Sequence, residues 1–138
     1  MLEVKVSREL DHSLEEVWGA LSDFGSVGWM QGIAKCVVEG DGVGMVRNIY
    51  VDPAGSPVRE KLTALDAAAH RIEYEIAEGN PMPVDNYKAW VAVEATGGGC
   101  RIDWGSTFDA RGVDDATAKA SLEGMYGVLI DWLIGGLS

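Results

Sequence analysis

Residues 58–76, VREKLTALDAAAHRIEYEI, decide the fold because they predict two strands joined by a turn. On either side of the segment DAAAH, apolar residues alternate with charged or polar ones, the period-two pattern of a half-buried strand. Two such runs separated by a short connection are typical of a β-hairpin. We expect the facing pairs to be Leu62 with Tyr74, Ala64 with Ile72 and Glu60 with Ile76.

The preceding residues extend this sheet by a further strand. The run MVRNIYV, residues 45–51, is followed by DPAGSP, residues 52–57, which is rich in turn formers. If DPAGSP is a hairpin turn, the facing pairs are Val51 with Val58, Ile49 with Glu60 and Arg47 with Leu62. The two hairpins then share one face, which is apolar except for Arg47, Glu60 and the hydroxyl of Tyr74. The opposite, solvated face carries Lys61, Thr63, Glu73 and Glu75.

Arg47 and Glu60 are the two charges on the otherwise apolar face. An unpaired charge is costly to bury, so their presence there requires an explanation. One interpretation is a structural ion pair that satisfies both groups and has no further role. The other is a polar floor in a ligand cavity. The sequence leaves both interpretations open.

The N-terminal region predicts a strand, a helix and a Gly-rich connection. Residues 2–7 alternate between apolar and polar side chains. Ser13 followed by Glu16 forms the capping-box pattern that starts a helix, and apolar residues at helical spacing extend it over residues 14–24. A second short helix is expected over residues 27–33. Phe24 and Trp29 lie here among glycines, either as caps on a cavity or as ordinary core packing.

The C-terminal half predicts another hairpin and a long helix. VDNYKAWVAVEA and CRIDWGSTFDA flank the turn TGGG. One register buries Tyr87, Ala89, Val91 and Val93, and the other buries Lys88 and Trp90; we prefer the first because it leaves Lys88 in water. Residues 114–134 carry a helical stripe of Ala118, Leu122, Met125, Leu129 and Trp132. Gly135 and Gly136 are expected to end this helix.

Composition limits the function classes. The chain has 138 residues and a formal net charge of −11, without a Lys/Arg cluster that would neutralise phosphates, so we expect no nucleic-acid partner. The same charge disfavours an anionic membrane surface, and no run is long enough to span a bilayer. Cys36 and Cys100 are expected to be free thiols. The start of the chain alternates and forms no apolar signal-peptide core, so we expect a cytoplasmic protein with one domain over residues 1–138.

Catalytic and metal motifs are weak. GDGVGMVR lacks the Lys-Ser/Thr ending of a phosphate-binding loop and leads into a strand, so it predicts a tight turn. His12 and His70 have no neighbours at metal-ligand spacing, and we expect neither a metal nor a cofactor. No nucleophile motif is present. The aromatic set Tyr74, Tyr87, Trp104 and Tyr126 is compatible either with ordinary core or with a hollow in which the hydroxyls need partners.

These segments, in this order, resemble the START/polyketide-cyclase-like (SRPBCC) superfamily, whose helix-grip fold is shared with the birch-pollen-allergen group. The resemblance covers about 130 residues and rests on SLEEVWGALSDFGSVGWM, GVGMVRNIYV, VREKLTALDAAAHRIEYEI, EGNPMPVDNYKAWVAVEA and GGGCRIDWGSTFDA. It implies an α+β fold in which a seven-stranded antiparallel sheet wraps around a long C-terminal helix. Two short helices would follow the first strand.

The resemblance also implies a cavity for an apolar or aromatic small molecule. By analogy Glu60 and Tyr87 point into it, and residues 52–57 and 79–83 guard its mouth. The ligand-binding residues that we expect are Trp29, Arg47, Ile49, Glu60, Leu62, Tyr74, Met82, Tyr87, Ala89, Trp104, Met125 and Leu129.

Two functions fit this cavity. The first is a ligand-binding or carrier protein, monomeric or weakly homodimeric, whose partner is the small molecule. The second is a cyclase, aromatase or dehydratase of the polyketide type, with Glu60 or Tyr87 as the proton carrier. A histidine or a second carboxylate facing Glu60 would favour the enzyme. None can be placed from the sequence, which therefore favours binding.

Overall fold

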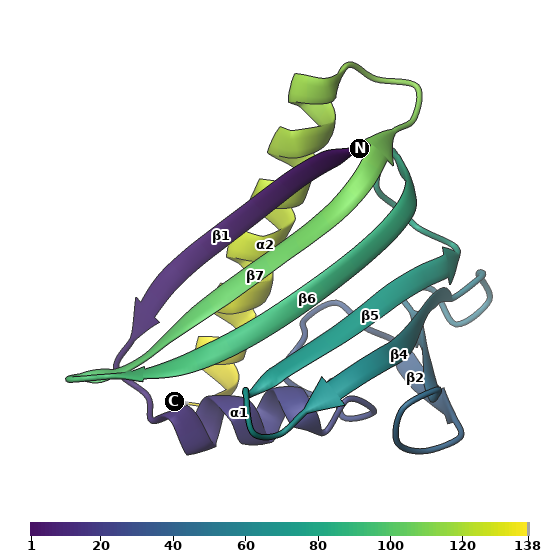
Figure 1. Ribbon diagram of the computed structural model, residues 1–138. Coiled ribbons are helices and arrows are strands. Elements are labelled where there is room, and N and C mark those ends of the chain that lie inside the picture. The colour runs from purple at the N-terminus through teal and green to yellow at the C-terminus, as the bar shows by residue number, and fades with distance from the viewer. Residues whose placement is uncertain (138) are drawn as a thin grey trace.

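The seven strands form one antiparallel sheet, and the C-terminal helix runs along one of its faces (Figure 1). The computed structural model describes residues 1–137, apart from the side chains of residues 77 and 78. The sheet order is β1-β7-β6-β5-β4-β3-β2. The strands are β1 (Leu2–Leu10), β2 (Lys35–Glu39), β3 (Val46–Tyr50), β4 (Val58–Asp66), β5 (Arg71–Glu78), β6 (Val84–Thr96) and β7 (Gly99–Ala110), and the helices are α1 (Leu14–Ser22) and α2 (Asp115–Leu137).

The start of α1 is the predicted capping box. The Ser13 hydroxyl accepts a hydrogen bond from the Glu16 amide at 3.2 Å, and the Glu16 carboxylate accepts one from the Ser13 amide at 3.3 Å. These bonds satisfy amides that have no partner within the helix. Val17 and Leu21 are the buried side chains on the inner face of α1.

The prediction of a second short helix over residues 27–33 is wrong, because this segment contains turns, bends and irregular backbone but no helix. Single backbone bonds close these turns, including Met30 N–H to the Val27 carbonyl at 2.9 Å. Glycine destabilises a helix, and Gly32 adopts a φ of 74°, outside the helical region. One short helix, α1, therefore precedes the rest of the sheet.

The β4–β5 hairpin has the predicted pairs Leu62 with Tyr74 and Glu60 with Ile76. The predicted pair of Ala64 with Ile72 is wrong. A register shift between Leu62 and Ala64 places Ala64 opposite Glu73, and Leu65 opposite Ile72. A bulge of this kind inserts an extra residue into one strand, which the alternation pattern does not signal.

The β3–β4 register also differs from the prediction. Arg47 lies opposite Glu60, and Ile49 opposite Val58, so the predicted pairs are displaced. The cause is the turn: β3 ends at Tyr50, and the Asp52 side chain accepts a hydrogen bond from the Ala54 amide at 2.9 Å. This Asx turn lies within a connection of residues 50–57, which is longer than the predicted turn of residues 52–57. In the observed register, Arg47 and Glu60 lie directly opposite each other.

The preferred β6–β7 register is confirmed. Val91 lies opposite Trp104, and Val93 opposite Ile102, with all four side chains buried. Lys88 is exposed, as expected. On the other face of the sheet the Trp90 ring covers Gly105, where an added Cβ would lie 2.6 Å from the ring.

Helix α2 continues to Leu137, so the predicted stop at Gly135 and Gly136 is wrong. The stripe that it buries consists of Ala118, Leu122, Tyr126, Ile130 and Leu133. Gly136 packs against Trp29, where an added Cβ would lie 2.9 Å from the Trp29 Cβ. This tertiary contact supports a last turn that glycine alone would disfavour.

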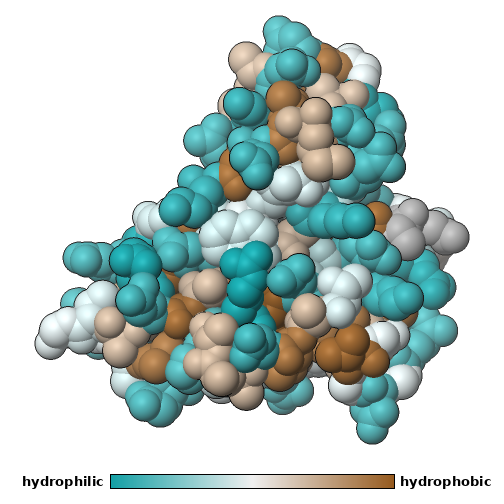
Figure 2. Space-filling model, viewed as in Figure 1, coloured by the Kyte–Doolittle hydropathy of each residue, from teal (hydrophilic) through white to brown (hydrophobic). Residues whose placement is uncertain are grey.

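The surface seen from the side of the sheet opposite α2 is largely polar, with apolar residues interspersed (Figure 2). Both cysteines are free, as predicted, with Cys100 buried and Cys36 partly buried. Among the described helices, none is long and apolar enough to cross a membrane.

Candidate ligand-binding cavity

A cavity of about 190 Å³ lies between the sheet and the C-terminal half of α2. It is smaller than the roughly 300–1,000 Å³ typical of ligand pockets. It is larger than the roughly 150 Å³ engineered apolar cavity that holds benzene. A cavity of this size accommodates a small ring compound, or one end of a longer molecule.

Five parts of the chain line this cavity. The sheet forms its floor and α2 forms one wall. The loops between α1 and β2, between β3 and β4, and between β5 and β6 complete the rim. The lining residues are Met30, Gln31, Ile33, Arg47, Ile49, Val51, Val58, Glu60, Tyr74, Ile76, Asn80, Pro81, Met82, Tyr87, Trp104, Met125, Leu129 and Trp132. Gln31, Val51 and Pro81 are exposed, so this rim faces solvent.

Arg47 and Glu60 form a nearly dry ion pair on the cavity floor. Arg47 Nε lies 2.6 Å from Glu60 Oε1, and the side chains are 5% and 12% exposed. Another guanidinium nitrogen donates to the Phe24 carbonyl at 2.9 Å, and the guanidinium carbon lies 3.8 Å from the centre of the Phe24 ring. The two charged groups therefore pair with each other, as in the first interpretation, and they also line the cavity, as in the second.

Phe24 thus holds the Arg47 guanidinium in two ways, through its carbonyl and through its ring. A cation stacked on an aromatic face is favourable, and more so where water is excluded. The buried Phe24 comes just after Asp23, the C-cap of α1, so the end of this helix positions the groups that orient the guanidinium. Phe24 does not itself line the cavity.

The buried aromatic residues are connected by hydrogen bonds. Trp104 Nε1 donates to the Tyr74 hydroxyl at 3.0 Å, and the hydroxyls of Tyr87 and Tyr126 are hydrogen-bonded to each other. The Trp104 ring stacks on Tyr126 with centroids 5.8 Å apart. These contacts satisfy polar groups that would otherwise be costly to bury.

Burial favours the neutral form of three tyrosines in and beside the cavity. Burial raises the pKa of Tyr74 far above its ordinary value, and the nearby Glu60 carboxylate raises this pKa further. Burial likewise raises the pKa of Tyr87 and the pKa of Tyr126. All three phenols therefore act as neutral hydrogen-bonding groups, because ionisation in a low-dielectric site is unfavourable.

Nine of the expected ligand-binding residues lie on the cavity surface: Arg47, Ile49, Glu60, Tyr74, Met82, Tyr87, Trp104, Met125 and Leu129. Trp29, Leu62 and Ala89 do not. Leu62 and Ala89 are buried in the adjoining core. Trp29 packs edge-on against Trp104, with centroids 6.4 Å apart, so it seals the core next to the cavity.

The remaining lining residues were not among those expected. Trp132 follows Leu129 on the same helical stripe, so its spacing could have identified it. Met30, Gln31 and Ile33 belong to an irregular segment that only tertiary packing positions. Val51 and Val58 flank the turn predicted to guard the mouth, and Asn80 and Pro81 lie in the second predicted loop.

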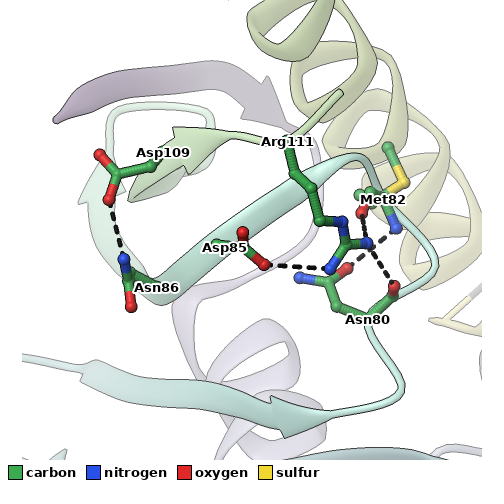
Figure 3. A network of polar contacts seen from close by, with 6 residues as sticks. All are labelled: Asn80, Met82, Asp85, Asn86, Asp109 and Arg111. Carbon is green, nitrogen blue, oxygen red and sulfur yellow. Dashed lines mark hydrogen bonds and ion pairs between the residues drawn. The ribbon is translucent and has the colours of Figure 1, made fainter. Parts of the chain in front are cut away.

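Arg111 fixes the loop between β5 and β6 (Figure 3). From the end of β7 its guanidinium donates to the Met82 carbonyl at 2.9 Å, to the Asn80 carbonyl at 3.4 Å and to Asp85 at 3.1 Å. The Asn80 side chain in turn accepts from the Met82 amide at 2.9 Å. The contact from Asn86 to Asp109, also visible in Figure 3, is separate from this network.

A sequence profile described as "Polyketide cyclase / dehydrase and lipid transport" matches residues 1–132. None of the curated proteins matches the chain. Among solved structures, an uncharacterized protein from Bacillus thuringiensis is 26% identical, with a TM-score of 0.84 over 99% of this chain and 98% of that one. The protein XoxI from Bacillus cereus is 25% identical, with a TM-score of 0.84 over 99% and 96%.

Ara h 8.0201 shares the fold at 19% identity, with a TM-score of 0.77 over 99% of this chain and 97% of that one. This likeness supports the helix-grip arrangement: a seven-stranded antiparallel sheet and a long C-terminal helix.

Proposed function

The chain belongs to the polyketide cyclase/dehydrase and lipid transport family, and from this premise we propose that it binds an apolar or aromatic small molecule in the cavity between the sheet and α2. The observation that carries the proposal is the lining itself, which is mostly aliphatic and aromatic with a single ion pair. Burial of apolar ligand surface would supply most of the affinity, and the few polar groups would fix the orientation.

A cyclase, aromatase or dehydratase using the same cavity is the second candidate. The family description supports it, and so does the presence of Glu60 beside neutral tyrosines. Against it, no histidine and no second carboxylate lie among the described lining residues. Glu60 also already accepts a hydrogen bond from Arg47. Binding without turnover is therefore the better-supported function.

Native mass spectrometry of the freshly purified protein, with extraction of any bound molecule, tests the proposal first. A stoichiometric apolar or aromatic passenger is the expected result, and turnover can then be assayed on that compound. Two matched variants locate the site: Leu129→Trp adds a ring at the cavity wall, whereas Val128→Trp adds it on the exposed side of α2. Loss of the passenger in the first variant alone is expected, and equal retention in both would place binding elsewhere.

A further inference from the structure

We propose that the cavity selects an uncharged ring compound that carries a hydroxyl group, and that it discriminates against carboxylates. This inference rests on the proposed function, because it names the ligand class for the same cavity. It depends on which polar groups the protein has already satisfied and which remain for a ligand.

The positive charge in the cavity is already neutralised. Arg47 is the sole cationic residue among the described lining residues, and Glu60 is the sole anionic one. They bond to each other, and the guanidinium also bonds to the Phe24 carbonyl and lies on the Phe24 ring. A ligand carboxylate would bring a second anion next to Glu60 without an unpaired cation to receive it. Desolvating such an anion is costly.

Two polar functions on the floor remain for a ligand. Glu60 Oε2 has no partner among the described residues, since the bond from Arg47 reaches Oε1. The Tyr74 hydroxyl accepts from Trp104, and its own hydrogen has no acceptor in the described part of the chain. The Tyr87 and Tyr126 hydroxyls bond to each other instead. The floor therefore presents one charged acceptor and one neutral donor.

A hydroxyl group complements this pair because it is both a donor and an acceptor. Its hydrogen would bond to Glu60 Oε2, and its oxygen would accept from Tyr74. An ether can make only the second of these bonds, and a hydrocarbon makes neither. The raised pKa of Tyr74 keeps the phenol protonated and able to donate. The cavity of about 190 Å³ limits the buried part to one or two rings.

Four probes that share one ring system separate these contributions: 2-naphthol, 2-methoxynaphthalene, naphthalene and 2-naphthoate. Their affinities for the intact protein can be measured by protein-observed NMR titration at neutral pH. We expect 2-naphthol to bind about tenfold or more tightly than 2-methoxynaphthalene, the effect of one hydrogen bond to a charged group. We expect 2-naphthoate to bind most weakly.

Substitutions show which residues cause these differences in affinity. Glu60→Gln should weaken the binding of 2-naphthol. It should strengthen the binding of 2-naphthoate, because the charge of Arg47 is then free to receive the carboxylate. Glu73→Gln, on the exposed face of the same sheet, is the matched control and should leave the order unchanged. Tyr74→Phe, which keeps the ring, should reduce the affinity for 2-naphthol several-fold, and Tyr50→Phe serves as its control. Tyr74→Phe also provides a test if Glu60→Gln does not fold.

Equal affinities for naphthalene, 2-methoxynaphthalene and 2-naphthol would overturn the inference while leaving the proposed function intact. So would binding of 2-naphthoate as tight as that of 2-naphthol. Failure of every probe to bind, naphthalene included, would instead contradict the proposed function itself.

Discussion

Arg47 and Glu60 are direct cross-strand partners, with Arg47 Nε 2.6 Å from Glu60 Oε1 on the floor of the cavity. Both side chains are almost fully buried, so each is the principal compensation for the charge of the other. This dependence makes the pair costly to break and less costly to replace as a whole.

Arg47→Met should lower the free energy of unfolding by about 3–5 kcal/mol, because it leaves the Glu60 carboxylate buried without a countercharge. Urea denaturation followed by tryptophan fluorescence measures this loss. Arg101→Met, which breaks the ion pairs from the half-exposed Arg101 to Glu94 and to Asp103, is the control and should have a much smaller effect.

The double variant Arg47→Met with Glu60→Leu completes the test. It should be more stable than Arg47→Met alone, since both charges are then absent and the floor is uniformly apolar. A loss of stability in the double variant equal to the sum of the losses of the two single variants would show that the two side chains do not stabilise each other.

The three buried tyrosines predict a loss of stability at high pH. The pKa values of Tyr74, Tyr87 and Tyr126 are raised in the folded protein, so the folded state retains protons that the unfolded state releases above a pH of about 10. Stability is therefore complete below that pH and falls as the pH rises, by about 1.4 kcal/mol per pH unit for each tyrosine.

Denaturant titrations between pH 9 and 11, together with absorbance of the ionised phenol, check this pH dependence. Ionisation of the buried tyrosines should coincide with unfolding. Tyr126→Phe should reduce the slope of stability against pH, and an unchanged slope would mean that Tyr126 ionises while the protein is folded.

Arg111→Ala should loosen the loop between β5 and β6 that lines the cavity. The variant loses the bonds from the guanidinium to the Met82 and Asn80 carbonyls and to Asp85. We expect faster hydrogen exchange at the Met82 amide and several-fold faster dissociation of a bound ligand, with a small change in global stability.

Asp109→Ala is the control for this loop, because it removes the acceptor of Asn86 and leaves the Arg111 network intact. Equal exchange rates in the two variants would show that the main-chain bond from Arg111 N–H to the Pro83 carbonyl, at 2.8 Å, is sufficient to hold the loop.

Much of the sheet could be predicted from the sequence because the period of two is local. The alternation around Tyr74 and Trp104 identified the inward faces that became the cavity floor. The pairing of Arg47 with Glu60 could not be predicted, because the connection between the two strands comprises residues 50–57 and not the predicted residues 52–57. Alternation specifies which face a residue occupies, whereas the turn specifies which partner it meets.

The rim of the cavity was less predictable for a different reason. Met30 and Ile33 reach it from a segment without helix or strand, so no period marks them. Their position depends on packing between distant parts of the chain, including the contact of Trp29 with Gly136. A glycine near the C-terminus of a helix commonly signals its end. Here Gly136 remains in the helix and provides room for the Trp29 backbone and Cβ.

The contact with Trp29 distinguishes Gly136 from its neighbour Gly135 in α2. A Cβ added at Gly136 would lie 2.9 Å from the Trp29 Cβ and 3.3 Å from its Cα, whereas a Cβ added at Gly135 would meet no atom within 4 Å. Gly135→Ala should therefore stabilise the protein by about 0.5–1 kcal/mol through helix propensity. Gly136→Ala should destabilise it by about 1–3 kcal/mol, because a backbone neighbour cannot move away as a flexible side-chain end can.

Thermal or urea denaturation of the two variants measures the difference in stability. Titration with 2-naphthol shows whether the substitutions also affect the cavity. Displacement of Trp29 should disturb its edge-on contact with Trp104, which lines the floor, so Gly136→Ala should also weaken binding. Gly135→Ala should leave the affinity unchanged. Equal stabilisation by both substitutions would mean that the segment around Trp29 moves freely on α2, and the rim would then be more adaptable than its packing indicates.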